Sequence, residues 1–386
     1  MGDIEKPLIA VKAVGDIGTI DPAQWNACAG EANPFVRHEF LHALEHSRSA
    51  TAETGWGPYH LVVEDGDGSL LGAAPMYLKG HSYGEYVFDH AWAHAFERAG
   101  GSYYPKLLIG VPFTPVTGPR LLAAPAAERA QIQRTLAAAA IEVAKKLEVS
   151  SLHINFPTAE EWERLGGFGL LLRAGEQFHW LNRGYGTFAE FLGELSSRKR
   201  KAIRRERREA LAHGIDIEIV AGDDLGEAHW DAFHEFYLDT GARKWGSPYL
   251  NRAFFSLAGE AMADRIALVM ARREGRYIAG ALNFIGSDTI FGRYWGAREH
   301  HRFLHFEVCY YQAIELAIER RLERVEAGAQ GPHKLTRGYL PVRTYSAHWV
   351  RNPSFRSAIA RYLEQERAEI DAEIGYLEGH SPFRKS

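Results

Sequence analysis

The chain has 386 residues, 46% hydrophobic and 24% charged, with a formal net charge of −4 at pH 7, which excludes a disordered or fibrous protein and predicts two folded domains. Its two cysteines, Cys28 and Cys309, lie far apart, so neither a disulfide framework nor a thiolate metal cluster is expected. No segment resembles a secretory signal or the run of about 20 apolar residues that spans a membrane, so we expect a cytoplasmic protein.

The first 80 residues combine helix and hairpin signals. Asp21-Pro22 is typical of a helix start, because an aspartate cap and a proline both suit the first turn. A second helix is predicted from about 37 to 47. Two apolar runs flank the glycine-containing turn at 65–68, which predicts a β-hairpin over 60–80.

Residues 81–120 are rich in aromatic residues, glycine and proline, and they show little periodicity. A loop of this length inside a folded domain usually carries function. An alanine-rich amphipathic helix is then expected over 124–147, followed by a strand over 150–157. A helix that leads into a strand in this way predicts a mixed α/β half.

The second half repeats a similar order of elements. The expected elements are a helix at 230–240, strands at 265–275, 277–286 and 289–297, a helix at 303–322 and a strand at 323–331. Helix, antiparallel strands, helix and strand is the order of the acetyltransferase (GNAT) fold, and the first half can be interpreted in the same way. An apolar stripe with helical spacing over 354–377 predicts a charged surface helix at the end.

We therefore predict a mixed α/β protein with two tandem GNAT-like lobes, each a mostly antiparallel central sheet flanked by helices. The predicted domains are a first lobe at 1–175, a second lobe at 176–350 with a basic helix at 197–212, and a C-terminal charged helix at 351–386 that packs back on the fold. A cleft between two such lobes is where we expect the chemistry.

A dense run of cations defines the basic helix. Only Glu206 and Glu209 oppose the cations, which repel one another at helical spacing unless an anion binds. One interpretation is a solvated helix with glutamate counterions; the other is a phosphate-binding face for RNA, a pyrophosphate or a lipid head group, with Arg200 and Arg204 among its contacts. The cations of the run are Arg198, Lys199, Arg200, Lys201, Arg204, Arg205, Arg207 and Arg208.

This segment resembles a known family. Its pattern of Leu, Ser, Arg, Ile-Arg, Ala and Gly over 195–217 is similar to the corresponding part of the Fem peptidoglycan aminoacyltransferases, which transfer amino acids from aminoacyl-tRNA to peptidoglycan precursors. The resemblance implies two GNAT-like lobes and acyl transfer to an amine, without fixing the substrate. Segments that resemble the proteobacterial Fem-like subgroup of predicted N-acyltransferases are GEYVFDHAWAHAF (84–96), YYPKLLIGVPFTPVTGPRLL (103–122), QFHWLNRGY (177–185), GRYWG (292–296), LHFEVCYYQAIE (304–315), AGAQGPHKLTRGYLPV (327–342) and YSAHW (345–349).

Acyl transfer to an amine needs a base, a site for the developing oxyanion and two aligned substrates, without a covalent enzyme intermediate. The chain has no G-x-S-x-G motif, so direct transfer is expected. Glu307 is our first choice for the base and His305 the second, because both lie at the start of a predicted helix whose amides stabilise anions. The alternative roles are a first-turn carboxylate that complements the helix dipole and a packed imidazole.

A glycine-containing turn follows the next predicted strand. Gly328, Gly331 and the neighbouring residues let the backbone approach a ligand closely. A phosphate or carboxylate site is one interpretation, and an ordinary turn with exposed basic residues is the other. The predicted contacts here are Gln330, His333, Lys334 and Arg337.

In the first half, Glu85, Asp89 and Lys106 lie among aromatic residues, where a charge is costly to bury unless it is paired. Asp89 and Lys106 form either a structural ion pair or a site for the substrate amine. In the second case Asp89 is a third candidate for catalysis, with Glu85 and Lys106 as substrate contacts.

Four further side chains are candidates for binding the substrate or donor. Arg120, Arg293 and Trp295 can clamp an anion or stack on a base, although GRYWG also suits a strand that packs its aromatic rings. Tyr345 belongs to a segment that carries the family resemblance.

Two patterns bear on cofactors. Coenzyme A-dependent acetyltransferases carry R/Q-x-x-G-x-G/A where the chain enters the central helix, but residues 298–307 contain no glycine, which favours another donor. HEFLH at 38–42 matches H-E-x-x-H, and His46 lies one turn further, as a zinc site requires. Because the metzincin continuation is absent, we favour a histidine stripe and assign no metal.

We expect an enzyme that requires no cofactor and transfers an acyl or aminoacyl group to the amine of a small molecule or peptide, in cell-envelope or peptide-metabolite synthesis. Aminoacyl-tRNA, bound along the basic helix, is the favoured donor, and acyl-CoA is the alternative. The acceptor is expected between the lobes, and a lipid-linked precursor at the membrane surface is another candidate partner. The rival hypotheses are a non-catalytic protein of the same fold that binds RNA or an anionic ligand, and a metalloprotease.

Overall fold

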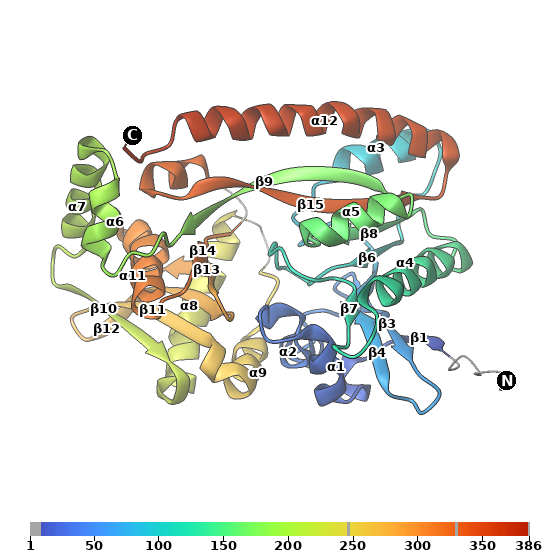
Figure 1. Ribbon diagram of the computed structural model, residues 1–386. Coiled ribbons are helices and arrows are strands. Elements are labelled where there is room, and N and C mark those ends of the chain that lie inside the picture. The colour runs from blue at the N-terminus through green and yellow to red at the C-terminus, as the bar shows by residue number, and fades with distance from the viewer. Residues whose placement is uncertain (1–8, 245–247, 329–330, 385–386) are drawn as a thin grey trace. The chain divides into compact units, whose positions relative to one another are not determined.

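The computed structural model describes residues 9–244, 248–328 and 331–384 (Figure 1). The chain divides into two compact units, each assembled from two stretches of sequence. Unit 1 contains Met1–Gly175 and Thr344–Glu369, and unit 2 contains Glu176–Arg343 and Ile370–Ser386. Within the described residues, none of the helices is both long and apolar enough to cross a bilayer.

Unit 1 contains two groups of strands. The first is an antiparallel sheet in the order β1-β3-β4-β7, and the second follows the order β15-β8-β6-β5-β2. Neighbours in the second group are antiparallel except for the parallel pair β6–β8. The strands are β1 (Ala10–Val14), β2 (Trp56–Pro58), β3 (His60–Glu64), β4 (Leu70–Ala74), β5 (Met76–Lys79), β6 (Lys106–Ile109), β7 (Leu122–Ala123), β8 (Ser151–Asn155) and β15 (Leu340–Val350), whose first residues belong to unit 2.

The helices of unit 1 begin where the sequence supplies caps. Asp21 accepts hydrogen bonds from the first amides of α1, and Thr158 and Glu161 form a capping box on α5. Leu136 and Ala137 of α4 belong to the hydrophobic core that also holds Leu61 and Ile154. The helices are α1 (Pro22–Ala29), α2 (His38–His46), α3 (His90–Arg98), α4 (Arg129–Lys146), α5 (Ala159–Gly167) and the part of α12 (Pro353–Gly379) that ends at Glu369.

Unit 2 contains a sheet in the order β10-β11-β12-β13-β14-β9. Its neighbours are antiparallel except for the parallel pair β13–β14. Trp180, Ile290, Ile314 and Val325 lie in its core. The strands are β9 (Leu171–Leu181), whose first residues belong to unit 1, β10 (Ile215–Ala221), β11 (Ile266–Arg273), β12 (Arg276–Ile285), β13 (Thr289–Ala297) and β14 (Arg324–Glu326).

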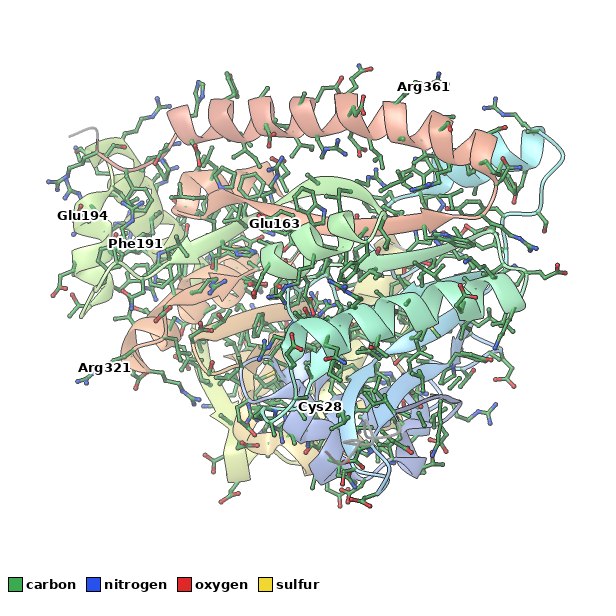
Figure 2. The ribbon with its side chains drawn as sticks, turned by 45° about the vertical axis from the view of Figure 1, so that its right-hand side comes forward. Cys28, Glu163, Phe191, Glu194, Arg321 and Arg361 are labelled. Carbon is green, nitrogen blue, oxygen red and sulfur yellow. The ribbon has the colours of Figure 1, made fainter. Side chains whose placement is uncertain are left out.

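Amphipathic helices complete unit 2. On α6, Phe191 is buried in the core and Glu194 is exposed, and both are labelled in Figure 2. Arg361, on the unit 1 part of α12, also projects into solvent (Figure 2). The helices of unit 2 are α6 (Phe188–Glu194), α7 (Ser197–Ala210), α8 (Glu227–Lys244), α9 (Arg252–Met262), α10 (Leu304–Phe306) and α11 (Gln312–Glu319).

The helix predicted over 303–322 is present but interrupted, which corrects the prediction of one continuous helix. Phe303 has a left-handed backbone (φ 64°), and a π-helical turn, η5 (Glu307–Tyr311), separates α10 from α11. The wider turn brings Glu307 and Tyr311 to α7, where they contact Arg207 and Glu206. Buried polar contacts with α7 therefore accompany the irregular turn.

The predicted fold class is confirmed: the protein is mixed α/β, with mostly antiparallel sheets flanked by helices. The hairpin expected over 60–80 is formed by β3 and β4, which pair antiparallel on either side of the predicted turn. The helices expected at 37–47, 124–147 and 354–377 are α2, α4 and α12.

Candidate functional site

The parallel pair β13–β14 is short. Three residue pairs join the strands, and the last is Phe291 with Glu326. β13 continues along β12 as far as Ala297, but no described strand pairs with residues 292–297 on the side where β14 ends. At Gly292, an added β-carbon would lie 3.4 Å from the Glu326 carbonyl oxygen and 3.4 Å from Asn283 Oδ1. The last residue pair of β13 and β14 therefore lies directly beside Gly292, where the backbone and Asn283 come close together.

Glu326 is a buried carboxyl group at this strand end. Its Oε1 lies 3.7 Å from His179 Nδ1. Its Oε2 has no hydrogen-bond partner in the described part of the chain. Burial raises the pKa of Glu326 to about 8, because Arg324 and Arg293 offset only part of the desolvation. A buried carboxyl group with a perturbed pKa and an unbonded oxygen is typical of a functional site.

Three more polar side chains share the surroundings of Glu326. Burial lowers the pKa of His179 to about 3, so its imidazole is neutral near pH 7. Lys334 is buried and donates to the carbonyl of Gly328 at 2.8 Å, and burial lowers its pKa to about 7. Asn283 Oδ1 is buried without a hydrogen-bond partner among the described residues. Glu326 and Lys334 therefore both change charge close to neutral pH.

Sequence reasoning identified only part of this cluster. It selected Lys334 from the turn after β14 but assigned Glu326 simply to a strand and gave His179 no role. An acidic residue followed by Ala-Gly, where a short predicted strand ends, was the available signal for Glu326. Gln330, another predicted contact, lies outside the described residues.

The other candidates from β13 and from the segments after it occupy two settings. Arg293 lies at an irregularity of β13, where Tyr294 pairs with Leu282 and Gly292 pairs with the next residue of β12. Three aromatic candidates, by contrast, meet around Tyr310: the ring of His305 lies 5.1 Å from Trp295 and 5.3 Å from Tyr310, and His333 Nε2 lies 3.0 Å from the Tyr310 hydroxyl.

Glu307 forms a buried ion pair in unit 2. Arg207 Nε lies 3.0 Å from Glu307 Oε2 and Nη2 lies 2.8 Å from Oε1, and Gln312 donates to Oε1 at 2.8 Å. Arg207 also binds Glu315, at 2.6 Å and 2.8 Å. Burial opposes the charge on Arg207, but its hydrogen bonds to Glu315 and Glu307 raise its pKa above the usual value. This geometry favours a structural role for Glu307, and its predicted role as the base stays a prediction.

Arg337, predicted to bind an anionic ligand, already binds an anion of the chain. Its guanidinium is buried, contacts both carboxylate oxygens of Glu206 at 3.0–3.1 Å through Nη2, and stacks 3.4 Å from the centre of the Phe306 ring. Nη1 donates to the carbonyl of His333 at 2.8 Å. The interpretation of Arg337 as an exposed cation of the turn is therefore wrong, because Glu206 on α7 neutralises it.

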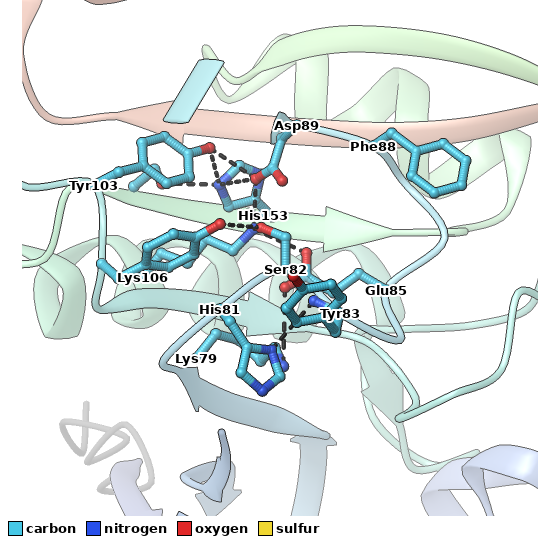
Figure 3. Close-up of polar contacts among 12 residues, drawn as sticks. Lys79, His81, Ser82, Tyr83, Glu85, Phe88, Asp89, Tyr103, Lys106 and His153 are labelled. Atoms are coloured by element: carbon cyan, nitrogen blue, oxygen red, sulfur yellow. Dashed lines mark hydrogen bonds and ion pairs between the residues drawn. The ribbon is translucent and has the colours of Figure 1, made fainter. Parts of the chain in front are cut away.

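In unit 1, the three charged residues predicted among aromatic rings meet in one buried cluster (Figure 3). Lys106 Nζ donates to Ser82 Oγ at 2.8 Å, to Glu85 Oε2 at 2.9 Å and to Asp89 Oδ2. Tyr103 also donates its hydroxyl to Asp89 Oδ2, at 2.7 Å. The predicted ion pair between Asp89 and Lys106 is confirmed.

The two carboxylates of this cluster, Asp89 and Glu85, have pKa values shifted in opposite directions. Burial alone would raise the pKa of Asp89, but the Lys106 ammonium holds it below the usual value. Burial raises the pKa of Glu85 to about 7 and lowers that of Lys79, 4.0 Å away, to about 6. Asp89 is consequently ionised near pH 7, and a carboxylate paired in this way is poorly suited to accept a proton. The cluster is better suited to holding its loop in place.

Two predicted contacts are structural in unit 1. Arg120 is buried and donates to main-chain carbonyls, including that of Asn155 at 2.8 Å from Nε, so the prediction that it clamps an external anion is not supported. Tyr345 packs its ring 5.0 Å from Trp162, and its carbonyl accepts a hydrogen bond from the amide of Phe156.

The histidines of HEFLH form a stripe on α2. The ring of His42 stacks between those of His38 and His46, at 5.7 Å and 5.0 Å. His38 Nε2 lies 3.0 Å from the carbonyl oxygen of Ile17. Within the described ranges, no three His, Cys, Asp or Glu side chains are grouped as a metal site.

Comparison with known proteins places the chain in a family. The model of the FemAB-like family, described as peptidoglycan biosynthesis/recognition, matches residues 16–385. The chain belongs to the FemAB-like family. No curated protein sequence is significantly similar to this FemAB-like chain.

Solved structures agree with the fold of this FemAB-like protein. FemX is 12% identical with a TM-score of 0.55, and the match covers 88% of this chain and 98% of FemX. L-PGS from Bacillus licheniformis is 9% identical with a TM-score of 0.50, over 87% and 98%. A tandem GNAT protein from the clavulanic acid biosynthesis pathway is 15% identical with a TM-score of 0.45, over 90% and 99%. The match to FemX confirms the predicted Fem-like fold.

The basic helix of the FemAB-like chain, α7, has two faces. Ile203 and Ala210 are buried, and Arg207 makes the ion pairs described above. The opposite face carries a cationic stripe of exposed residues, and within the described contacts only Arg205 meets a carboxylate, Glu209 at 3.7 Å. Arg200 is half-buried and lies off the stripe. The stripe consists of Arg198, Lys201, Arg204, Arg205 and Arg208.

Proposed function

We propose that this FemAB-like protein is an N-acyltransferase that joins an acyl or aminoacyl group to an amine of a peptidoglycan precursor, with Glu326 as the base. The observation that carries the proposal is the buried, unbonded oxygen of Glu326 at the point where β13 loses its parallel partner. The family description supports a substrate from peptidoglycan metabolism.

Glu326 suits the removal of a proton from an amine. In the proposed step the amine nitrogen attacks the acyl carbonyl carbon, its proton passes to the Glu326 carboxylate, and the bond between the acyl carbon and the leaving oxygen or sulfur breaks. Because burial raises the pKa of Glu326 to about 8, its basic form is strong and increases as the pH approaches 8. Lys334, with its pKa lowered to about 7, is the candidate to supply a proton to the leaving group.

Gly292 lies beside the proposed base, because a side chain there would approach Asn283 Oδ1 and the Glu326 carbonyl. A substrate that is held at this point has its reacting atoms next to Glu326, and such alignment contributes to the rate.

The cationic stripe favours aminoacyl-tRNA as the donor. Five exposed cations within 11 residues of α7 repel one another, and the described carboxylates neutralise at most one of them. A polyanion would remove this repulsion and release counterions. The alternative donor is an acyl-CoA. Both donors are cytoplasmic, so the proposal includes a cytoplasmic location.

The test compares donors with the full-length protein and a lysine-containing pentapeptide of the peptidoglycan type. Total tRNA charged with radioactive amino acids is one donor, and radioactive acetyl-CoA is the other. We expect labelled peptide from charged tRNA, loss of transfer after RNase treatment, and steep inhibition by salt. Release of free thiol from acyl-CoA with labelling of the peptide would support the alternative donor.

Variants test the base. Glu326→Gln is expected to slow transfer by about 10²–10⁴-fold, the usual contribution of a general base, while Glu323→Gln, at an exposed position beside β14, leaves the rate unchanged. Glu307→Gln tests the rival base. Wild-type rates for Glu326→Gln would refute its role. Tight binding of tRNA by a wild-type protein that transfers nothing from either donor would favour the non-catalytic binding protein.

A further inference from the structure

One buried ammonium group fixes the loop between β5 and α3. Lys106 Nζ binds the side chains of Ser82, Glu85 and Asp89, which occupy three separate points along that loop. Gly84 adds a further constraint, because its φ is +78° and an added β-carbon would lie 2.5 Å from the Phe113 ring. The buried Lys106 and the close packing at Gly84 therefore fix the backbone conformation of residues 80–89.

This anchoring turns aromatic rings outward. Because Glu85 and Asp89 point inward to Lys106, Tyr83 and Phe88 project into solvent and are 63% and 55% exposed. Figure 3 shows Phe88 directed away from the charged cluster. Exposing two large rings on a loop that is fixed in this way is unfavourable unless a ligand covers them.

Four rings form a row, of which three are exposed and the fourth, His81, is half-buried. His81 lies 5.1 Å from Tyr83, Tyr83 lies 6.1 Å from His90, and His90 lies 6.4 Å from Phe88, all between ring centres. The four residues His81, Tyr83, Phe88 and His90 are called the ring row below. The Tyr83 hydroxyl and the His90 imidazole can hydrogen-bond to polar groups of a ligand, whereas both ring nitrogens of His81 bond to the main chain, at Thr54 and Tyr83.

The charge around the ring row decides the class of ligand. From 80 to 97 the sequence contains no lysine or arginine, so a polyanion such as RNA or an anionic membrane would find no cation on this segment. The nearby Arg173, which donates to the Phe88 carbonyl at 2.8 Å, is paired with Glu366 at 2.7 Å. A neutral ligand with flat apolar faces and polar edges fits this surface.

We propose that the ring row binds the sugar rings of a peptidoglycan precursor or strand. A pyranose ring presents a face of C–H groups, whose partial positive charge suits the negative face of an aromatic ring, and its hydroxyl and acetamide groups lie at the edge. The proposal rests on the proposed function, since it takes the ligand from peptidoglycan metabolism. Lys106 is then a positioning residue that presents the rings without contacting the sugar.

The test measures binding of the N-acetylglucosamine tetramer to the full-length protein by calorimetry and by saturation-transfer NMR. Tyr83→Ala/Phe88→Ala should weaken binding at least about tenfold, as expected when two contact rings are removed. The control is Tyr362→Ala/Tyr376→Ala, which removes two rings of α12 that are 51% and 66% exposed, and it should bind like the wild type.

Each result bears on the proposal. NMR saturation transfer to the N-acetyl and ring protons that disappears in Tyr83→Ala/Phe88→Ala alone supports it. Absence of binding by the wild type, or equal binding by both double variants, overturns it. Binding of tRNA or of phosphatidylglycerol vesicles that depends on Tyr83 and Phe88 also overturns it. Glu326→Gln should bind the tetramer like the wild type. The transfer rate of that variant therefore tests the proposed base, and the binding experiment tests the ring row independently.

Discussion

The two units contain the same strand feature and use it differently. Among the described strand pairs, each unit has one parallel pair, which is joined by three residue pairs. A glycine follows the last paired residue of the first strand: Gly110 in unit 1 and Gly292 in unit 2. In unit 1 the guanidinium of Arg120 donates to the carbonyl of Asn155, the residue after the last paired residue of β8. In unit 2 the corresponding end carries Glu326, with an unbonded oxygen.

This difference indicates how similar strand pairs can serve two roles: the buried polar groups of unit 1 hold a conformation, and Glu326 of unit 2 is available for chemistry. The polar groups of unit 1 bind one another: Lys106 is tied to three side chains, and Glu161 accepts from the amides of Arg120 and Leu121. Buried charges that are paired in this way hold a conformation. Glu85 and Asp89 also have one unbonded oxygen each, but they bind Lys106 through the other oxygen. Glu326 binds no lysine or arginine in the described contacts, so it retains more capacity to exchange a proton.

The largest effect on stability is expected from Lys106→Met. Removing the ammonium leaves Glu85 and Asp89 buried without their cation, which should lower the free energy of unfolding by about 3–5 kcal/mol. Chemical denaturation followed by circular dichroism measures it. Lys145→Met is the control, because Lys145 pairs with Glu142 on the surface. A loss below 1 kcal/mol for Lys106→Met would contradict the supporting role of unit 1.

A smaller effect is expected from pH at Glu326. Its pKa in the folded protein, about 8, lies above the usual glutamate value of about 4.3, so the folded state binds the proton more tightly. The corresponding stabilisation is complete below about pH 4 and is lost as the pH rises through 8. The free energy of unfolding should therefore fall between about pH 4 and pH 8 in the wild type relative to Glu326→Gln and level off above pH 8. Parallel pH profiles for the two proteins would show that Glu326 is not perturbed.

A loss of about 1 kcal/mol is expected from Thr158→Ala, which removes the cap of α5. Thr158 orients Glu161, which accepts from the amides of Arg120 and Leu121, so these two amides should exchange hydrogen faster. Thr187→Ala removes the matching cap of α6 in unit 2. Thr187→Ala should lower the free energy of unfolding by a similar amount without changing hydrogen exchange at the Arg120 amide. Equal exchange rates at Arg120 in both variants would show that the α5 cap does not hold the Arg120 backbone in place.

The smallest effect is expected from the cationic stripe. Replacing Lys201, Arg204 and Arg208 by glutamine should raise the stability of unit 2 by a few tenths of a kcal/mol, because repulsion between like charges falls. Thermal unfolding at low salt measures this, and the gain should vanish at high salt. The same variant should reduce the salt dependence of tRNA binding. A loss of stability would show that the stripe makes structural contacts.

The sequence predicted features that local chemistry determines. The turn at 65–68 fixed the hairpin, and the position of Lys106, Glu85 and Asp89 among aromatic residues indicated a buried pair, which the structure contains. Glu307 was selected for its place at a helix start, but its partner, Arg207, lies 100 residues away. Pairing over such a distance leaves no local pattern.

Glu326 escaped notice for the same reason. Its strand, β14, is three residues long. Its neighbour across the sheet is His179 on β9, which lies far earlier in the chain. The π-helical turn was also invisible, because apolar spacing over 303–322 suits an α-helix equally well. Family resemblance supplied the fold class, but the polar groups at the end of β14 required the positions of distant strands.

The way in which the chain alternates between units has a consequence for biosynthesis. Unit 1 receives the unit 1 part of β15 and much of α12 only after nearly all of unit 2 has been made. Residues 346–350 of β15 pair with residues 151–155 of β8. A nascent chain that ends near Gly175 therefore lacks one strand of unit 1. Unit 1 cannot complete its folding on the ribosome before unit 2 has been synthesised. Expression of 1–175 alone should give insoluble material, whereas adding 344–369 through a linker should restore a folded fragment.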